Sequence, residues 1–267
     1  MVIDFHTHIF PDAIAKRTIE KLEEISGTRA DTDGTKAGLI SKMEKDGIDL
    51  SVILPVVTKP SQFETVNAFA KELCREKRLR SFGGIHPECE NIPEKIKHIK
   101  SLGLRGVKIH PDYQGAFIED ERYAVILSEC IKNDLYVVTH SGKDPLSPDC
   151  VHCTPVGILS LLAKAGAENA KPHLVLAHIG ANFMWEETQR LLVGKPVYFD
   201  LSCSLRKIDK DLLLKIIKTH GADKILFASD SPWSDPKKDL DYFNALPLES
   251  EEKEMILYKN ALKILGE

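Results

Sequence analysis

The sequence lacks any long hydrophobic run. No stretch reaches the length that crosses a membrane, and the first residues carry neither a basic segment nor the apolar stretch of a secretion signal. We therefore expect a cytoplasmic protein that does not act at a membrane.

Excess positive charge is also missing. The 36 Lys and Arg residues are outnumbered by 40 Asp and Glu, which gives a net charge of -4. The one basic cluster, residues 75–80, is typical of a solvated helix end. We therefore expect a small-molecule substrate and no nucleic-acid partner.

Cysteine is too sparse for a disulfide scaffold, since six residues in a chain of 267 favour reduced thiols. Cys150 and Cys153 form one Cys-x-x-Cys with His152 inside it. A structural zinc site needs about four ligands, and the chain has no second such pair. We interpret this segment as a loop over the mouth of a site.

Apolar runs rich in β-branched residues recur along the chain at intervals of roughly 30 residues. They are 2–8, 50–57, 81–86, 104–110, 135–140, 173–178, 197–201 and 224–229. Most are continuously apolar, which is typical of parallel strands buried on both faces. No linker or low-complexity tract separates them, so we expect one domain over 1–267.

Helical patterns lie between these runs, at 12–25, 36–46, 62–77, 93–101, 119–133, 154–165, 182–192, 207–220 and 251–265. Segments 142–153 and 231–248 are rich in Pro, Asp and Ser and are predicted as loops. Eight strands that alternate with helices predict an α/β fold, a single (β/α)8 TIM barrel.

Active-site residues of such barrels lie at the C-terminal ends of the strands. The residues at the predicted strand ends are His6, His8, His86, Lys108, His110, His140, His178 and Asp230. His6 and His8 alternate along a strand and therefore point to the same side. His86 and His110 each precede a proline, so they could line a pocket or hold a His-Pro turn.

Several donors at one mouth predict a metal ion, because buried histidine and aspartate must find partners. Nitrogen and oxygen donors without cysteine favour zinc, with manganese or iron as alternatives. Water bound to such an ion loses its proton at a pKa of about 7. Asp230 beside it is a natural general base, and a further histidine could orient the water.

The motifs in their order resemble the amidohydrolase superfamily, specifically its amidohydrolase-related (amidohydrolase 2) branch. They are DFHTHIFPD at 4–12, GVKIHP at 106–111, VTHSG at 138–142, LAHIG at 176–180, FASD at 227–230 and NALKILG at 260–266. The resemblance implies His6, His8, His140 and Asp230 as ligands of one metal. It also implies that His178 contacts the catalytic water or binds a second metal.

The expected number of metal ions in the site depends on the role of Lys108. In some superfamily members a lysine on the fourth strand becomes a carbamate that bridges two metals, and the segment around Lys108 is similar. Alternatively, Lys108 anchors a substrate carboxylate or pairs with an acidic residue. We expect a direct role in the site.

The resulting prediction is a metal-dependent hydrolase that cleaves an ester, lactone or amide bond in a small polar substrate, with Asp230, His178 and Lys108 as catalytic residues. The alternative is a metal-dependent non-oxidative decarboxylase of an unsaturated or aromatic acid, which the same branch contains. A phosphatase or nuclease, or a catalytically silent binding module, is less favoured. A homodimer is possible, since such barrels often pair.

Other conspicuous residues have structural interpretations. His98 and His220 are expected on the surface at helices, and His173 is expected to be structural. Trp185 and Trp233, which follow the sixth and eighth runs, could wall the pocket or simply pack.

Overall fold

The computed structural model describes residues 1–267. Its strands are β1 (Ile3–Thr7), β2 (Leu50–Ile53), β3 (Leu79–Ser81), β4 (Gly83–Gly84), β5 (Gly106–Ile109), β6 (Tyr136–Thr139), β7 (Leu174–Leu176), β8 (Tyr198–Asp200) and β9 (Ile225–Leu226). Each predicted run therefore contains a strand. The third run corresponds to two short strands, β3 and β4, on either side of Phe82.

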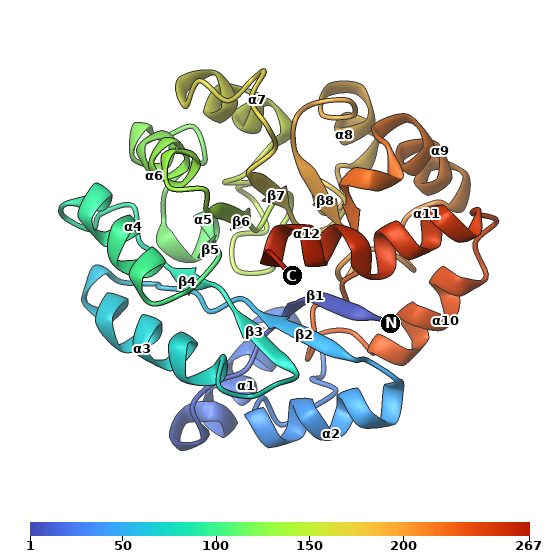
Figure 1. The fold of residues 1–267 in the computed structure, drawn as a ribbon, viewed down its shortest axis with the longest axis horizontal. Helices are drawn as coiled ribbons and strands as arrows, with labels where there is room; N and C mark the ends of the chain where they lie inside the picture. The colour runs from blue at the N-terminus through green and yellow to red at the C-terminus, as the bar shows by residue number, and fades with distance from the viewer.

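The strands are parallel and pair in the order of the chain, as β1-β2-β3 and β4 through β9. Hydrogen bonds beyond the strands join the last run to the first. Phe5 N donates to Phe227 O over 3.0 Å, and Asp230 N donates to His6 O over 2.9 Å. The strands thus form the predicted TIM barrel, which Figure 1 shows from one end with helices around it.

The helices surround the barrel. They are α1 (Asp12–Ser26), α2 (Lys36–Asp46), α3 (Phe63–Leu73), α4 (Ile92–Ser101), α5 (Pro111–Gln114), α6 (Glu121–Lys132), α7 (Pro155–Lys164), α8 (Trp185–Leu191), α9 (Lys210–His220), α10 (Pro236–Asn244), α11 (Ser250–Glu254) and α12 (Asn260–Leu265). Local chemistry sets several ends. Thr154 accepts a hydrogen bond from Gly157 N before Pro155, and Gly47 ends α2 in the left-handed conformation.

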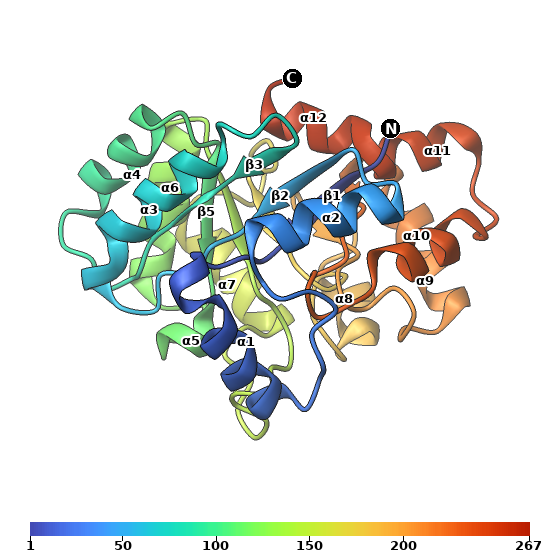
Figure 2. The ribbon, with the colours of Figure 1, turned by 90° about the horizontal axis from the view of Figure 1, so that it is seen from below.

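One end of the barrel is closed by the C-terminal segment. Ala261, Ile264 and Leu265 of α12 pack with inward-facing side chains such as Phe5 and Phe82. A larger apolar cluster lies between the strands and the outer helices. Figure 2 places α12 on the side of the N-terminus, with α1 and α5 on the opposite side. The open end therefore lies at the C-terminal ends of the strands.

The structure corrects two local expectations. Segment 231–248 is not all loop, because α10 begins at Pro236 behind the N-cap Asp235. His220 is not on the surface: it is 2% exposed, stacks on Phe199, and contacts Val197 O at 2.9 Å. No helix of the structure is long and apolar enough to span a membrane.

Candidate active site

The six residues predicted for the site all line one cavity of about 1180 Å³ at the C-terminal ends of the strands. They are His6, His8, Lys108, His140, His178 and Asp230. All are buried except His8, which is partly exposed. The barrel therefore brings residues from five strands together, as the sequence predicts.

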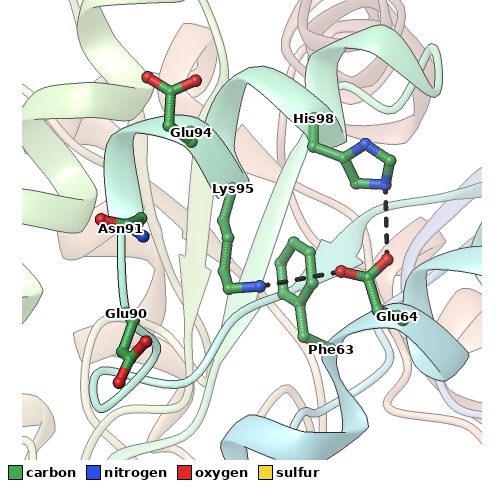
Figure 3. Close-up of a pocket in the computed structure, with 7 residues that line it drawn as sticks. All are labelled: Phe63, Glu64, Glu90, Asn91, Glu94, Lys95 and His98. Atoms are coloured by element: carbon green, nitrogen blue, oxygen red, sulfur yellow. Dashed lines mark ion pairs between the residues drawn. The ribbon is translucent and has the colours of Figure 1, made fainter.

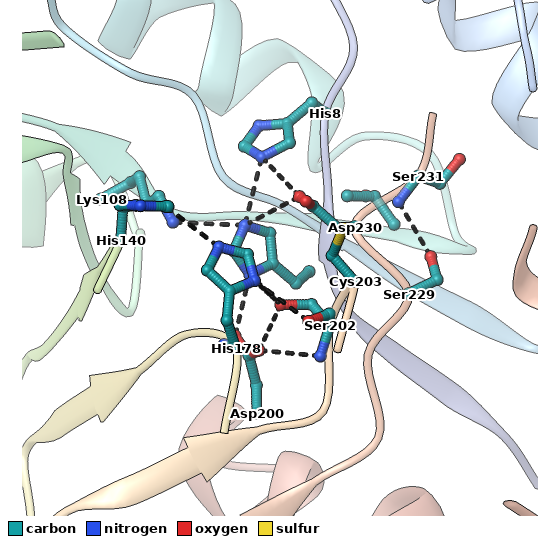
Figure 4. A network of polar contacts seen from close by, with 12 residues as sticks. His8, Lys108, His140, His178, Asp200, Ser202, Cys203, Ser229, Asp230 and Ser231 are labelled. Carbon is teal, nitrogen blue, oxygen red and sulfur yellow. Dashed lines mark hydrogen bonds and ion pairs between the residues drawn. The ribbon is translucent and has the colours of Figure 1, made fainter. Parts of the chain in front are cut away.

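His6, His8 and Asp230 converge most closely. His6 Nε2 lies 3.1 Å from His8 Nε2, and Asp230 Oδ1 lies 3.4 Å and 3.3 Å from the same two atoms. Figure 4 shows His8 and Asp230 turned toward one point above His178. A tetrahedral ion with bonds of about 2.1 Å holds its ligands about 3.4 Å apart. The three side chains thus fit a divalent metal ion.

Asp200 fixes the ring of His6. Its carboxylate accepts from His6 Nδ1 over 2.8 Å, and burial followed by Lys108 lowers the pKa of His6 to about 4. A carboxylate can only accept, so Nδ1 of the neutral ring carries the hydrogen and Nε2 is left with a lone pair. Nε2 is the atom that faces His8 and Asp230. Asp200 thereby prepares His6 as a metal ligand.

Asp200 itself is held by a ring of donors. Its Oδ1 accepts from Ser202 N over 3.0 Å and from His178 N over 3.1 Å, and the Ser202 hydroxyl donates to it as well. Burial opposes its ionisation, but His6, His178 and Ser202 hold the pKa of Asp200 below its ordinary value. Neither Asp200 nor Ser202 was predicted from the sequence. The only signal was their position at the end of the seventh strand.

The backbone at the site is strained. Asp230, His178 and Cys203 adopt φ values of 74°, 61° and 55°, which residues with a side chain rarely take. Asp4 holds the segment before Asp230, because its carboxyl accepts from Ser229 N over 2.9 Å and from the Ser229 hydroxyl over 2.5 Å. Such strain aims Asp230 at the histidines.

The carboxyl group of Asp230 is held in its ionised form. Burial opposes ionisation, but the nearby His6, His8 and His178 bring the pKa of Asp230 down to about 2. Oδ1 faces His6 and His8, and the residue lines the cavity. The ionised carboxylate is therefore placed to exchange a proton with a bound molecule.

His140 and His178 lie side by side on the other flank. His178 Nε2 is 3.0 Å from His140 Nδ1, and His178 Nδ1 contacts Ser202 O at 3.0 Å. Burial lowers the pKa of both rings, that of His140 strongly. His178 stacks on His6 with ring centroids 5.6 Å apart. His140 Nε2 also lies 3.7 Å from Asp144 Oδ2, which brings His140 near His110 and Asp144 as well.

That second group comprises His110, His140 and Asp144. His110 and His140 stack with ring centroids 4.3 Å apart and planes within 8°. Asp144 Oδ2 lies 3.7 Å from Nε2 of each ring. Asp112 Oδ2 lies 4.0 Å from His140 Nε2. His110 thus belongs to the pocket, whereas Asp112 and Asp144 were not predicted from the sequence.

Lys108 is fully buried at the base of the cavity. Its Nζ lies 3.2 Å from His6 Nε2, and burial lowers its pKa to about 8. It forms no ion pair with an acidic side chain, so the interpretation of a lysine paired with Asp or Glu is wrong. The ammonium group faces the lone pair of His6 Nε2.

The remaining wall combines apolar and cationic side chains. Apolar members include Phe10, Ile14, Val66, Phe69, Leu146, Phe183 and Trp233, and cationic ones are Arg17, Lys21, Lys143 and Lys207. Segment 142–153 contributes Lys143 through Leu146 and Pro148, as expected of a loop over the mouth. Its Cys150 and Cys153 are free, and neither belongs to a metal-binding group.

Other singled-out residues lie outside the cavity. Trp185 packs beneath His178, donating to its carbonyl over 3.1 Å. His86 sits in a His-Pro turn, where its Nδ1 accepts from Glu88 N over 3.1 Å. His173 is structural, since it stacks on Tyr136.

His98 is exposed, as predicted. It borders a shallow hollow between α3 and α4, where His98 and Lys95 both face Glu64 (Figure 3). That hollow brings together one histidine and separated carboxylates. It lacks the convergent donors of the main cavity.

Comparisons with known proteins agree with this architecture. A family model described as Amidohydrolase matches residues 3–266. No curated protein sequence matches the chain. Among solved structures, 2,6-dihydroxybenzoate decarboxylase from Rhizobium is similar with a TM-score of 0.76 at 17% identity, covering 99% of this chain and 98% of that one.

Two further structures are similar over their length. One is 5-carboxyvanillate decarboxylase from Novosphingobium aromaticivorans in complex with manganese, with a TM-score of 0.74 at 15% identity, covering 100% of this chain and 96% of that one. The other, from Staphylococcus aureus, is assigned to the amidohydrolases, with a TM-score of 0.70 at 18% identity, covering 100% and 99%. At such identities the likeness shows the fold alone.

Proposed function

Since the chain belongs to the amidohydrolase family, we propose that it is a metal-dependent decarboxylase of an unsaturated or aromatic carboxylic acid. The observation that carries this proposal is the base of the cavity. There, the unpaired Lys108 ammonium lies beside the group formed by His6, His8 and Asp230. A substrate carboxylate would meet positive charge at this point, while a planar apolar body would contact Phe10, Phe69 or Trp233.

The residues that would hold the metal are His6, His8 and Asp230, with His178 next to them. The bound ion would supply positive charge for substrate oxygens and acidify a water. The solved decarboxylases named with manganese make Mn²⁺ the first ion to test, with zinc and iron as alternatives. His140, which the family resemblance implies as a fourth ligand, faces another group of donors.

In the proposed reaction the bond between the carboxyl carbon and its neighbouring carbon breaks, and carbon dioxide leaves. The electron pair stays on the neighbouring carbon, which must receive one proton. Asp230 rests ionised and lines the cavity, so it can take that proton from water and deliver it, while the hydroxide left behind combines with the carbon dioxide to give bicarbonate. Lys108 holds the substrate carboxylate, and Asp200 keeps His6 in the form that binds metal.

Hydrolysis of an ester, lactone or amide is the second candidate. The likeness to a structure assigned to the amidohydrolases favours it, and the ionised Asp230 could equally remove a proton from water. The two reactions leave different products. Decarboxylation releases carbon dioxide and, in deuterium oxide, places deuterium on the carbon that lost the carboxyl group.

A direct test uses protein stripped of metal and reloaded with Mn²⁺. We would assay hydroxybenzoates, 5-carboxyvanillate and related unsaturated acids for carbon dioxide release, and a set of esters and lactones for acid release. Asp230→Asn should lower turnover by about 10²- to 10⁴-fold. Asp223→Asn, at an exposed position, is the matched control. Cleavage of esters or lactones without any carbon dioxide release would reject the decarboxylase proposal.

A further inference from the structure

The cavity carries an excess of positive charge, although the chain as a whole has a net charge of -4. The cationic side chains that line it are Arg17, Lys21, Lys108, Lys143 and Lys207, and the carboxylates are those of Asp144 and Asp230. Charge of one sign gathered in a cleft raises the local concentration of a ligand of the opposite sign. The cavity therefore favours an anionic ligand, and a single carboxylate beside Lys108 leaves the other four cations without a counter-charge from that ligand.

Lys143 and Lys207 approach one short segment of the cavity mouth from two neighbouring loops. Lys143 N donates to Asn182 O over 3.0 Å, and Asn182 Nδ2 donates to Lys143 O over 3.0 Å. Lys207 Nζ lies 5.8 Å from the centre of the Phe183 ring. The loops after β6, β7 and β8 thus meet at Asn182 and Phe183, and two of them bring a lysine there.

Neither lysine is neutralised by an acidic side chain. No carboxylate oxygen lies within 4.0 Å of Lys143 Nζ or Lys207 Nζ. Lys207 Nζ donates to the sulfur of Cys203 over 3.1 Å, and a thiol carries no charge at pH 7. Both lysines are exposed, and the Phe183 ring beside Lys207 is 52% exposed. Two positive charges and an aromatic face are therefore available to a ligand at the mouth.

Lys207 also lies close to the group proposed to bind metal. Its partner Cys203 is next to Asp230 in Figure 4. Cys203 N donates to Ser229 O over 3.0 Å, which holds Cys203 against the residue that precedes Asp230. The cavity of about 1180 Å³ exceeds the usual range of about 300 to 1,000 Å³ for ligand pockets. One substrate thus has room to reach both Lys108 and the mouth.

We propose that Lys143 and Lys207 bind a second carboxylate of the substrate, so that the substrate is a dicarboxylic acid. The first carboxylate lies at Lys108 and reacts, while the second stays bound at the mouth and is unchanged. This inference rests on the proposed function for the first carboxylate. An ammonium group binds an anion as a compact charge on a flexible stem. The subsite therefore selects the charge of the second group more than its exact position.

The test measures binding rather than turnover. Full-length protein loaded with Mn²⁺ is titrated calorimetrically with isophthalate, with terephthalate, and with the monomethyl ester of each, which has lost one of the two charges. The variants are Lys143→Met, Lys207→Met and the double variant, since methionine keeps a long side chain without charge. Lys195→Met is the matched control, because Lys195 is exposed and lies outside the cavity. Retention of Mn²⁺ shows that a variant is folded.

An ion pair at an exposed position contributes up to about fivefold in affinity. We expect the unmodified chain to bind at least one diacid up to about 25-fold more tightly than its monoester. Each single variant should reduce this preference to about fivefold, the double variant should abolish it, and Lys195→Met should keep it in full. Equal affinity of the unmodified chain for diacids and monoesters would overturn the subsite. A preference that the double variant keeps would also overturn it and would indicate Arg17 and Lys21 instead.

A parallel assay of carbon dioxide release separates this inference from the proposed function. Release from 2-hydroxybenzoate and 4-hydroxyisophthalate alike, without tighter binding of diacids, would overturn the subsite and leave the decarboxylase proposal intact. Tighter binding of diacids that depends on Lys143 and Lys207, without release from any acid, would support the subsite and reject the decarboxylase. Absence of both binding and release would overturn both.

Discussion

Asp200→Asn tests whether a residue that would not contact the metal controls its binding. The amide oxygen must take the place of Oδ1, because that position accepts from both Ser202 N and His178 N. The NH₂ group then replaces Oδ2 and faces His6 Nδ1, which is 2.8 Å away and carries a hydrogen. Two donors would meet, so His6 must move its hydrogen to Nε2. That is the atom turned toward His8 and Asp230.

The expected cost follows from this exchange. Loss of the partner that orients a ligand lowers metal affinity by about 10- to 100-fold. By the relation of about 1.4 kcal/mol per tenfold change, this is about 1.4 to 2.8 kcal/mol. A hydrogen bond to a charged group contributes about 1.5 to 3 kcal/mol, which is the same range. The free energy of unfolding should fall by a similar amount even without metal, since Asp200 is fully buried and ionised.

The assay is competition for Mn²⁺ against a fluorescent chelator, with thermal unfolding recorded on the metal-free protein. Asp120→Asn is the control: Asp120 caps α6 with its carboxylate, and asparagine caps equally well. If Asp200→Asn binds Mn²⁺ as tightly as the unmodified chain while the melting temperature falls, Asp200 is structural only. In that case the tautomer of His6 does not control metal binding.

Three further outcomes are expected. Burial lowers the pKa of His220 to about 4 in the folded chain, below its ordinary value of about 6.5. The unfolded chain therefore binds the extra proton, and His220 alone lowers the free energy of unfolding by about 3 kcal/mol as the pH drops from 6.5 to 4. In urea unfolding, His220→Gln should lose this share of the pH dependence and keep the share of other buried histidines such as His6; an unchanged pH dependence would contradict the assignment. Lys108→Met should keep the full metal content and raise KM more than it lowers kcat, whereas loss of metal would support the bridging carbamate. Addition of Mn²⁺ at about 100 times Kd should stabilise the stripped protein by about 2.7 kcal/mol, and an unchanged melting temperature would contradict metal binding to the folded state.

The barrel was predictable because its signal is long and repeated. Each buried parallel strand must be apolar on both faces, so runs such as 135–140 stand out without any knowledge of their neighbours. Short elements carry less signal. Helix α10 has a clear N-cap and proline at Asp235-Pro236, but its nine residues are rich in Lys and Asp and resemble a loop. His220 looked exposed because Gly221 ends the helix there, yet its ring fills a gap beside Phe199.

The candidate metal ligands stand out in the sequence for a reason that does not apply to the residues that support them. A histidine at the end of an apolar strand is conspicuous, because its ring nitrogens cannot stay unpaired there. Asp200 ends a strand too, but a single aspartate at that place is equally consistent with a surface loop. Its role depends on His6, which is 194 positions away in the chain. Asp200 and His6 come into contact only when the barrel closes, so the sequence alone does not reveal this pair.

Asp112 and Asp144 show the same limit more strongly. Each lies beyond its strand, in a segment whose composition predicts only a turn, and neither spacing forms a recognised ligand motif. What distinguishes them is that one oxygen of each has a partner while the other faces His140. That distinction exists only in three dimensions, after two loops have folded against each other. A barrel allows such arrangements because its loops vary independently of the strands that carry them.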